Sequence, residues 1–184
     1  AILLALSFGS NALAYGLTAK SWLVSDSDGK IVQSENIDEV RSIASITKLL
    51  TVITVLDAHQ DLDQQLALST KLHDRLPRKG QTLSRGTLIE LAMVNSDNRA
   101  AQTLCEHYPG GFEACVIAMN AKLISLGMIH SRVFEPTGLD ARNQSTARDL
   151  IQLVRAGRYY QPIIEAAKKT RIEIKVRKKW LIFP

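Results

Sequence analysis

Long apolar runs, aromatic residues and metal-ligand clusters are all scarce in this 184-residue sequence. No stretch is long enough and apolar enough to span a membrane, so we expect no stable membrane span. Aromatic residues make up only 5% of the chain, and no recognition motif accompanies the net charge of +5, so nucleic acid is not an expected partner. The histidines and cysteines show no metal-ligand spacing, so we expect no metal and no other cofactor.

The composition that is present is ordinary for a soluble globular protein, with 46% hydrophobic and 22% charged residues. The length suffices for one domain with a real core, or for one domain and a small lobe. Basic residues gather near the C-terminus at Lys168, Lys169, Arg171, Lys175, Arg177, Lys178 and Lys179. We interpret this group as a solvated strand edge that lysines protect from pairing with another chain.

The N-terminal residues 1–14 combine an apolar run with an Ala-Leu-Ala sequence at 12–14. This pattern is typical of the apolar region and cleavage site of a secretory signal, and it predicts a periplasmic or secreted protein. Because an initiator Met and a basic leading region are lacking, we expect the sequence to begin inside that signal. The alternative is a hydrophobic first strand or helix.

The two cysteines, Cys105 and Cys115, flank a Pro-Gly-Gly turn at 109–111. Exported proteins meet oxidising conditions, and such a turn would allow the two thiols to meet in a disulfide. Two buried free thiols are the alternative. A disulfide requires Cα atoms within about 4.4–6.8 Å of each other.

The first ordered segment should be a hairpin, because residues 21–25 and 30–33 flank the turn sequence Asp-Ser-Asp-Gly. Trp22, Val24, Ile31 and Val32 are expected to face a core, and residues 61–68 are expected to be irregular. Apolar periodicity and capping residues then predict helices at 47–56, 87–95, 99–107, 111–126, 145–155 and 162–167, and a strand at 171–176.

Ser45 and Lys48 form an S-x-x-K sequence at the start of the most apolar predicted helix. Residues three apart share a helix face, so the two side chains should meet. A serine becomes a nucleophile when a base takes its proton, and a lysine among apolar neighbours gives up its charge more readily. The alternative interpretation is that Ser45 only caps the helix and Lys48 extends outward to solvent.

A second motif, Ser96-Asp97-Asn98, lies between two predicted helices, where a loop can direct side chains into a cleft. The order S-x-x-K and then S-D-N is that of penicillin-binding proteins and class A β-lactamases, which share the motif set S-x-x-K, S-D-N and K-T-G. Two ordered motifs, each in a suitable predicted context, favour a catalytic interpretation of both.

Most of residues 21–160 resembles the low-molecular-mass penicillin-binding proteins, which are serine D-alanyl-D-alanine carboxypeptidases and endopeptidases, and the endopeptidase branch above all. The resemblance is carried by residues 44–57, 98–101, 107–111, 118–122, 125–128, 135–139, 143 and 145–150. It implies an α/β (α+β) fold of the penicillin-binding and β-lactamase-like class, with an antiparallel sheet flanked by helices. Residues 15–184 would form the N-terminal portion of this catalytic domain.

The resemblance also implies roles for four residues. Ser45 would be the nucleophile, Lys48 its base, and Ser96 a proton relay to the leaving amine, while Asn98 would bind the substrate amide. The substrate would be a peptidoglycan stem peptide or cross-link, and β-lactam antibiotics would be covalent inhibitors. Asp97 is interpreted as a structural residue that holds its loop. Glu135 is also interpreted as structural, since Pro-Thr-Gly-Leu follows it as in the peptidases.

The third motif of the family, K-T-G, does not follow Asn98 in this sequence, and Lys169-Thr170-Arg171 is only a near match. The resemblance therefore implies a domain that is incomplete at the C-terminus, with K-T-G expected beyond Pro184. Two alternative functions stay open: a class A-like β-lactamase, and a non-catalytic sensor or wall-binding module of the same fold.

Overall fold

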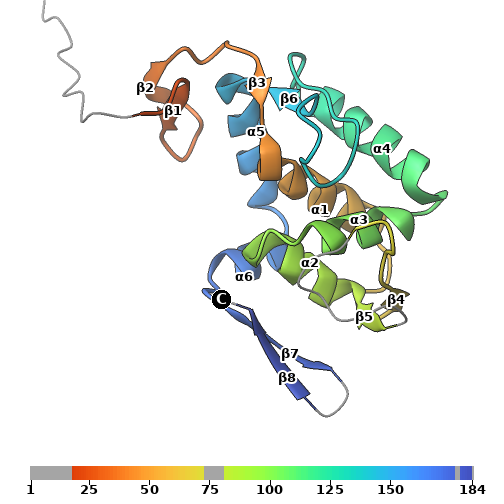
Figure 1. Cartoon of the computed structure of the whole chain (residues 1–184). Coiled ribbons are helices and arrows are strands. Elements are labelled where there is room, and N and C mark those ends of the chain that lie inside the picture. The colour runs from red at the N-terminus through yellow and green to blue at the C-terminus, as the bar shows by residue number, and fades with distance from the viewer. Residues whose placement is uncertain (1–17, 73–80, 177–178, 184) are drawn as a thin grey trace, which may run out of the picture.

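The computed structural model of the chain describes residues 18–72, 81–176 and 179–183, and it consists of packed helices with short strands at the margins (Figure 1). The helices are α1 (Thr47–Asp57), α2 (Arg85–Val94), α3 (Asn98–Glu106), α4 (Gly111–Ser125), α5 (Ala147–Gly157) and α6 (Gln161–Ala167), and a 3-10 turn, η1 (Ala44–Ile46), leads into α1.

Helix α1 lies at the centre of the helical body, where α2, α3, α4 and α5 all pack against it. Its residues from Leu50 to Val55 are all buried, as expected for a helix that is apolar or hydroxylic on every side. Thr54, which is buried in this core, satisfies its hydroxyl group locally, because its Oγ1 donates to the carbonyl of Leu50 at 2.9 Å. This packing fixes the position of the N-terminal end of α1.

The strands form four separate antiparallel pairs in the described residues. They are β1 (Trp22–Ser25) with β2 (Ile31–Glu35), β3 (Arg41–Ser42) with β6 (Gln144–Ser145), β4 (Gln65–Ala67) with β5 (Thr82–Ser84), and β7 (Ile172–Val176) with β8 (Lys179–Phe183). The expected mixture of helices and antiparallel strands is therefore present, although the strands make four small sheets within the described part of the chain rather than one. The β7–β8 hairpin projects from the lower end of the body in Figure 1.

The β1–β2 hairpin is present as predicted, but its faces are not those expected. Val24 and Val32 are 49% and 64% exposed, and Trp22 and Ile31 are only half-buried. Successive strand residues point to opposite faces, and the neighbour of Val24, Leu23, is the one that lines an internal groove. The prediction that Val24 and Val32 face a core was wrong, because the strand pattern does not reveal which face finds a partner.

Two helices, α2 and α5, start two residues away from the predicted positions, and one segment that was expected to be irregular contains a strand. Helix α2 begins at Arg85, because Ser84 is its cap and accepts the backbone N–H of Thr87 at 3.2 Å. Helix α5 is capped by Thr146, which accepts the N–H of Asp149 at 3.1 Å. In both cases a hydroxyl side chain just before the helix supplies the cap. Residues 61–68 include β4 and are not wholly irregular.

Cys105 and Cys115 form a disulfide that joins the end of α3 to α4, with a Cα–Cα distance of 5.4 Å. The distance lies inside the range set from sequence, and both residues are fully buried. The disulfide alternative is therefore the one the structure contains. In the described part of the chain, no helix has the length and apolarity needed to cross a bilayer.

Candidate active site

Ser45 lies in the 3-10 turn η1, immediately before α1, and is exposed. The turn is tight, since Ala44 has a φ of +42°, an uncommon conformation for a residue other than glycine. Gly138 packs directly against it: a β-carbon at Gly138 would stand 1.8 Å from the carbonyl oxygen of Ala44. Two segments that are far apart in the sequence therefore fix the backbone of Ser45.

Lys48 lies one turn further along α1 and is only 2% exposed. Its Nζ donates to the Ser45 Oγ at 2.9 Å and to the backbone carbonyl of Thr137 at 2.7 Å. The alternative in which Lys48 extends into solvent is wrong. A buried amine beside a serine hydroxyl is the arrangement required of a base that activates a nucleophile.

The loop from Glu135 to Leu139 supplies the far side of this contact. Thr51, one turn after Lys48, donates its hydroxyl to the carbonyl of Pro136 at 2.8 Å. Two successive carbonyls of the loop thus accept hydrogen bonds from two side chains of α1. These hydrogen bonds join the loop to the helix in a buried setting, where the low dielectric strengthens them and makes the arrangement rigid.

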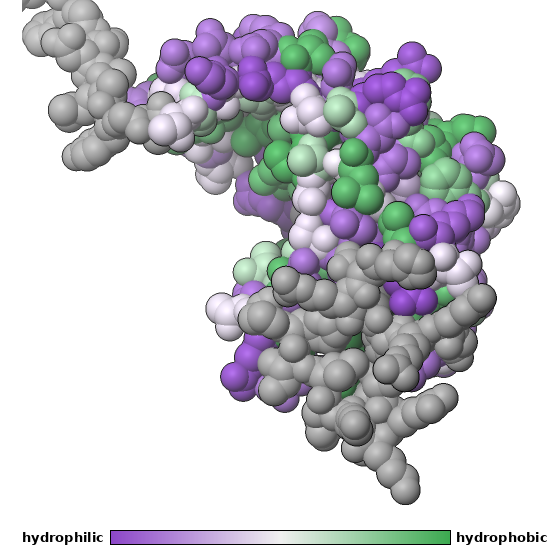
Figure 2. Space-filling view, in the orientation of Figure 1, coloured by the Kyte–Doolittle hydropathy of each residue, from purple (hydrophilic) through white to green (hydrophobic). Residues whose placement is uncertain are grey.

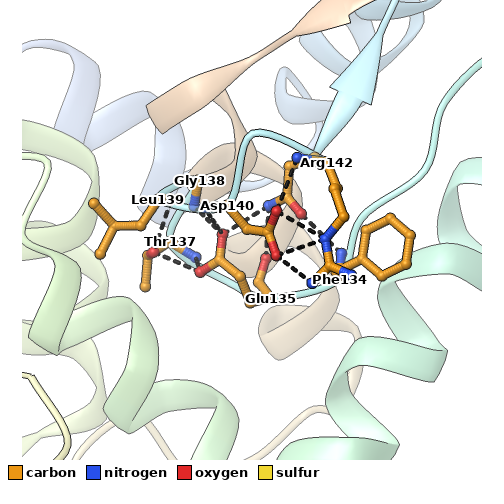
Figure 3. A network of polar contacts seen from close by, with 8 residues as sticks. Phe134, Glu135, Thr137, Gly138, Leu139, Asp140 and Arg142 are labelled. Carbon is orange, nitrogen blue, oxygen red and sulfur yellow. Dashed lines mark hydrogen bonds and ion pairs between the residues drawn. The ribbon is translucent and has the colours of Figure 1, made fainter.

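Glu135 organises the loop from within (Figure 3). Its carboxylate accepts the backbone N–H groups of Thr137 at 2.7 Å and Gly138 at 2.6 Å, the Thr137 hydroxyl, and the Asn143 side-chain amide at 2.9 Å. Asn143 is fully buried and also donates to the Thr47 hydroxyl. The structural interpretation of Glu135 agrees with these contacts, which lie within its own loop and its immediate support.

The second motif lies between α2 and α3. Ser96 is exposed and has a φ of +54°, so its backbone is in the left-handed region. Asp97 is the N-cap of α3 and accepts the N–H of Ala100 at 2.7 Å, which agrees with the predicted structural role. Asn98 is the first residue of α3 and is half-buried.

A groove of about 620 Å³ brings Ser45, Lys48 and Ser96 together. Most of its lining is apolar: Leu23, Ile46, Leu49, Ala92, Met93, Ala147, Leu150, Ile151 and Val154 complete it. Figure 2 shows hydrophobic surface in the recess at the left, below the β1–β2 hairpin. Asn98 follows Ser96 closely in the chain but does not belong to the lining in the described structure.

The contact between the Thr137 carbonyl and Lys48 was not predicted from the sequence. The carbonyl is a main-chain group 89 residues from Lys48, so no side-chain motif records it. The sequence feature that could have indicated this contact is the Pro-Thr-Gly turn that contains Gly138. In the structure Gly138 has a φ of +84°. Among the described residues, no cluster of three histidine, cysteine or acidic side chains could hold a metal ion.

A serine hydroxyl, a buried lysine amine and a second serine thus share one apolar groove. Residues 9–181 match the family model described as D-alanyl-D-alanine carboxypeptidase. The chain belongs to the D-alanyl-D-alanine carboxypeptidase family. The resemblance stated from the S-x-x-K and S-D-N motifs is confirmed by this match.

Two curated relatives of the D-alanyl-D-alanine carboxypeptidase family are D-alanyl-D-alanine endopeptidases. That of Escherichia coli K12 is 39% identical over 189 residues, which cover 93% of this chain and 60% of the relative. That of Pseudomonas aeruginosa is 45% identical over 151 residues, which cover 78% of this chain and 49% of the relative. The chain therefore spans about half to three-fifths of the length of these relatives.

The fold of the family is also found among solved structures. Penicillin-binding protein D2 of Listeria monocytogenes, in its cefotaxime-bound form, aligns with a TM-score of 0.77 and 25% identity, covering 91% of this chain and 72% of that one. The predicted penicillin-binding fold class is confirmed by this likeness.

Proposed function

We propose that the protein is a serine-type D-alanyl-D-alanine carboxypeptidase or endopeptidase that acts on peptidoglycan stem peptides or cross-links. The observation that carries the proposal is the 2.9 Å contact between the buried Lys48 amine and the Ser45 hydroxyl, at the mouth of the groove. Membership of the family and the endopeptidase names of two relatives support the substrate class.

In the acylation step, Ser45 Oγ attacks the carbonyl carbon of the penultimate D-alanine while its proton passes to the neutral amine of Lys48. The carbonyl π electrons move to the oxygen, and the backbone N–H of Ser45 would be one donor to that oxyanion. Burial of Lys48 favours this role, because removal from water disfavours the charged form of an amine.

The leaving amine needs a proton when its bond to the carbonyl carbon breaks. Ser96 lines the same groove as Ser45 and Lys48, so its hydroxyl is placed to pass a proton from Lys48 to that amine. Asn98, two residues further on, would bind the substrate amide. Water then attacks the ester on Ser45, returns a proton to the enzyme, and releases the shortened peptide.

The remaining proposals concern location, domain and inhibitors. We propose that residues 1–14, which lie outside the described residues, are the remnant of a secretory signal and that the protein works in the periplasm or after secretion. Residues 15–184 would be the N-terminal portion of the catalytic domain. β-Lactams are proposed covalent inhibitors, since a solved relative holds cefotaxime.

The contacts of Glu135 argue against a class A-like β-lactamase. Such an enzyme needs a carboxylate that activates water near the nucleophile, and Glu135 is the candidate from sequence. Its carboxylate instead accepts the N–H groups of Thr137 and Gly138 and the amide of Asn143. A carboxylate that is engaged by its own loop is not presented to a water beside Ser45.

The test is labelling with a fluorescent penicillin, using the protein expressed from its complete coding sequence. Ser45→Ala should remove labelling entirely, and Lys48→Arg should reduce it by about 10²–10⁴-fold, because a guanidinium does not deprotonate in proteins. Ser34→Ala and Lys30→Arg, at exposed positions, are matched controls that should label like the wild type.

Circular dichroism checks that each variant is folded. Full labelling of a folded Lys48→Arg protein would show that Lys48 is not the base. No labelling of the folded wild type would favour the non-catalytic sensor or wall-binding module, whereas rapid turnover of nitrocefin would favour the β-lactamase. Release of D-alanine or of a cross-linked peptide then distinguishes carboxypeptidase from endopeptidase.

A further inference from the structure

Two carboxylates of the loop between Val133 and Asn143 point in opposite directions (Figure 3). Asp140 faces outward, and its two oxygens accept from the Arg142 guanidinium at 2.6–3.0 Å. Glu135 faces inward, where one oxygen accepts from the Thr137 N–H and the other from the Gly138 N–H. The same loop therefore contains a carboxylate that serves the surface and another that serves the buried side of the active site.

The inward carboxylate controls one peptide group that Lys48 uses. The N–H of Gly138 and the carbonyl of Thr137 belong to the same peptide unit, which is planar and trans. In a trans peptide these two groups point in opposite directions. Because the Glu135 carboxylate accepts the N–H at 2.6 Å, the carbonyl is turned the other way, towards Lys48 Nζ at 2.7 Å.

We propose that Glu135 is a positioning residue for acylation at Ser45: its carboxylate sets the plane of the Thr137–Gly138 peptide, and that carbonyl orients the Lys48 amine. The inference rests on the proposed function. A neutral amine has two N–H groups and one lone pair, so when one N–H points to the Thr137 carbonyl the lone pair can be directed to the Ser45 hydroxyl.

While Glu135 is in place, the surrounding groups allow the Thr137–Gly138 peptide a single orientation. Rotation of the peptide plane would turn the Gly138 N–H towards the N–H groups of Lys48, so that donors would face donors. The position of Gly138 against the Ala44 carbonyl also leaves no room for the loop to move closer to Ser45. The carboxylate thus holds a carbonyl that the amine needs, without itself touching the substrate.

Glu135→Gln tests this role, with Asp140→Asn as a matched control that makes the same change in the same loop. A glutamine places one acceptor oxygen and one NH2 group where Glu135 has two acceptor oxygens, so in the same position one of the Thr137 and Gly138 N–H groups would face a donor. The measurement is the rate constant for acylation by a fluorescent penicillin from about pH 6 to about pH 10, on the protein expressed from its complete coding sequence. Above the midpoint of that profile the Lys48 amine is neutral in every variant, so differences in its protonation no longer affect the rate constant. The plateau value then reports how well the amine is oriented.

The expected result is a fall of about 10–100-fold in the alkaline plateau for Glu135→Gln, the size of effect that misplacement of a catalytic group produces. Asp140→Asn should keep the wild-type plateau, and Glu135→Asp, which retains a carboxylate, should recover part of the loss. A wild-type plateau with only a shifted midpoint would show that Glu135 acts through its charge alone and would overturn the positioning role. If Glu135→Gln does not fold, the plateau of Glu135→Asp decides, and an unchanged plateau overturns the proposal.

A crystal structure of each variant separates this proposal from the proposed function. In Glu135→Gln the Thr137 carbonyl should lie beyond hydrogen-bond distance of Lys48 Nζ, and in Asp140→Asn it should stay in contact. A carbonyl that keeps its wild-type place in Glu135→Gln refutes the positioning role even if the wild type acylates normally. Absence of acylation in the wild type refutes the proposed function instead, and the carbonyl position still tests Glu135.

Discussion

The two segments that accompany Ser45 and Lys48 in the site are built in different ways. We call the loop 135–139 the inner side of the site: it does not line the groove, its Pro136 and Thr137 are buried, and their carbonyls accept hydrogen bonds from α1. The outer side is the turn that holds Ser96, which is exposed and has a left-handed backbone. We therefore expect changes on the inner side to affect stability and acylation together, and changes on the outer side to affect them separately.

The largest effect is expected from Gly138→Ala, a substitution on the inner side. The new methyl group would need the place of the Ala44 carbonyl, 1.8 Å away, and the residue would have to keep a φ of +84°. Overpacking and a left-handed backbone together should lower the free energy of unfolding by about 2–5 kcal/mol. Acylation should fall as well, because the loop must withdraw from Ser45. Urea unfolding and penicillin labelling measure the two effects.

Gly127→Ala is the matched control for that experiment. Gly127 has a φ of +72°, but a β-carbon there would have no neighbour within 4 Å. It should lose only about 1–2 kcal/mol for the left-handed backbone, with acylation unchanged. Equal losses at Gly127 and Gly138 would show that the close approach to Ala44 contributes nothing.

The next effect is expected from the disulfide, which stabilises the helices behind the inner side. Cys105 lies 4.0 Å from the sulfur of Met119, and that sulfur lies 3.8 Å from the Thr51 hydroxyl. Replacing both cysteines by alanine should lower the free energy of unfolding, because the disulfide restricts the unfolded chain. The loss should be only about 2–3 kcal/mol, because the loop that the disulfide closes is short. Labelling at a temperature where the variant stays folded should persist. An unchanged urea midpoint would contradict a stabilising disulfide.

A smaller effect of opposite sign is expected at the outer side. Ser96→Gly should raise the free energy of unfolding by about 1 kcal/mol, because glycine adopts a φ of +54° without strain. The same change removes the hydroxyl and should slow acylation, as should Ser96→Ala, which keeps the strain. Comparison of the two variants by thermal unfolding and labelling rate separates strain from chemistry. A Ser96→Gly protein that labels at the wild-type rate would exclude the proposed relay.

The helical core and the contact between Ser45 and Lys48 could be predicted from sequence, because each depends on residues close together in the chain. The apolar run of α1 and the three-residue spacing of Ser45 and Lys48 determine burial and a shared face without knowledge of any partner. Helix starts could be predicted only approximately, because several hydroxyl residues lie near each start and the structure uses Ser84 and Thr146 as the caps. The exposed face of β1 and the Thr137 carbonyl could not be predicted, because both depend on what a distant segment places beside them.

The smallest effect is expected from Asp140, the outward carboxylate of the loop 135–140. The hydrogen bonds from the Arg142 guanidinium hold the pKa of Asp140 at about 2, below its ordinary value of 3.8. A lowered pKa stabilises the folded state above the unfolded-state pKa, and this contribution disappears as the pH falls from about 4 to about 2. Asp140→Asn should therefore lower the urea midpoint slightly and by a constant amount above about pH 4. The difference from the wild type should shrink as the pH falls through about 2 and should vanish only below that pH. A difference that persists there would show that Asp140 acts through packing rather than through its charge, and loss of acylation in this variant would remove the distinction between the two carboxylates.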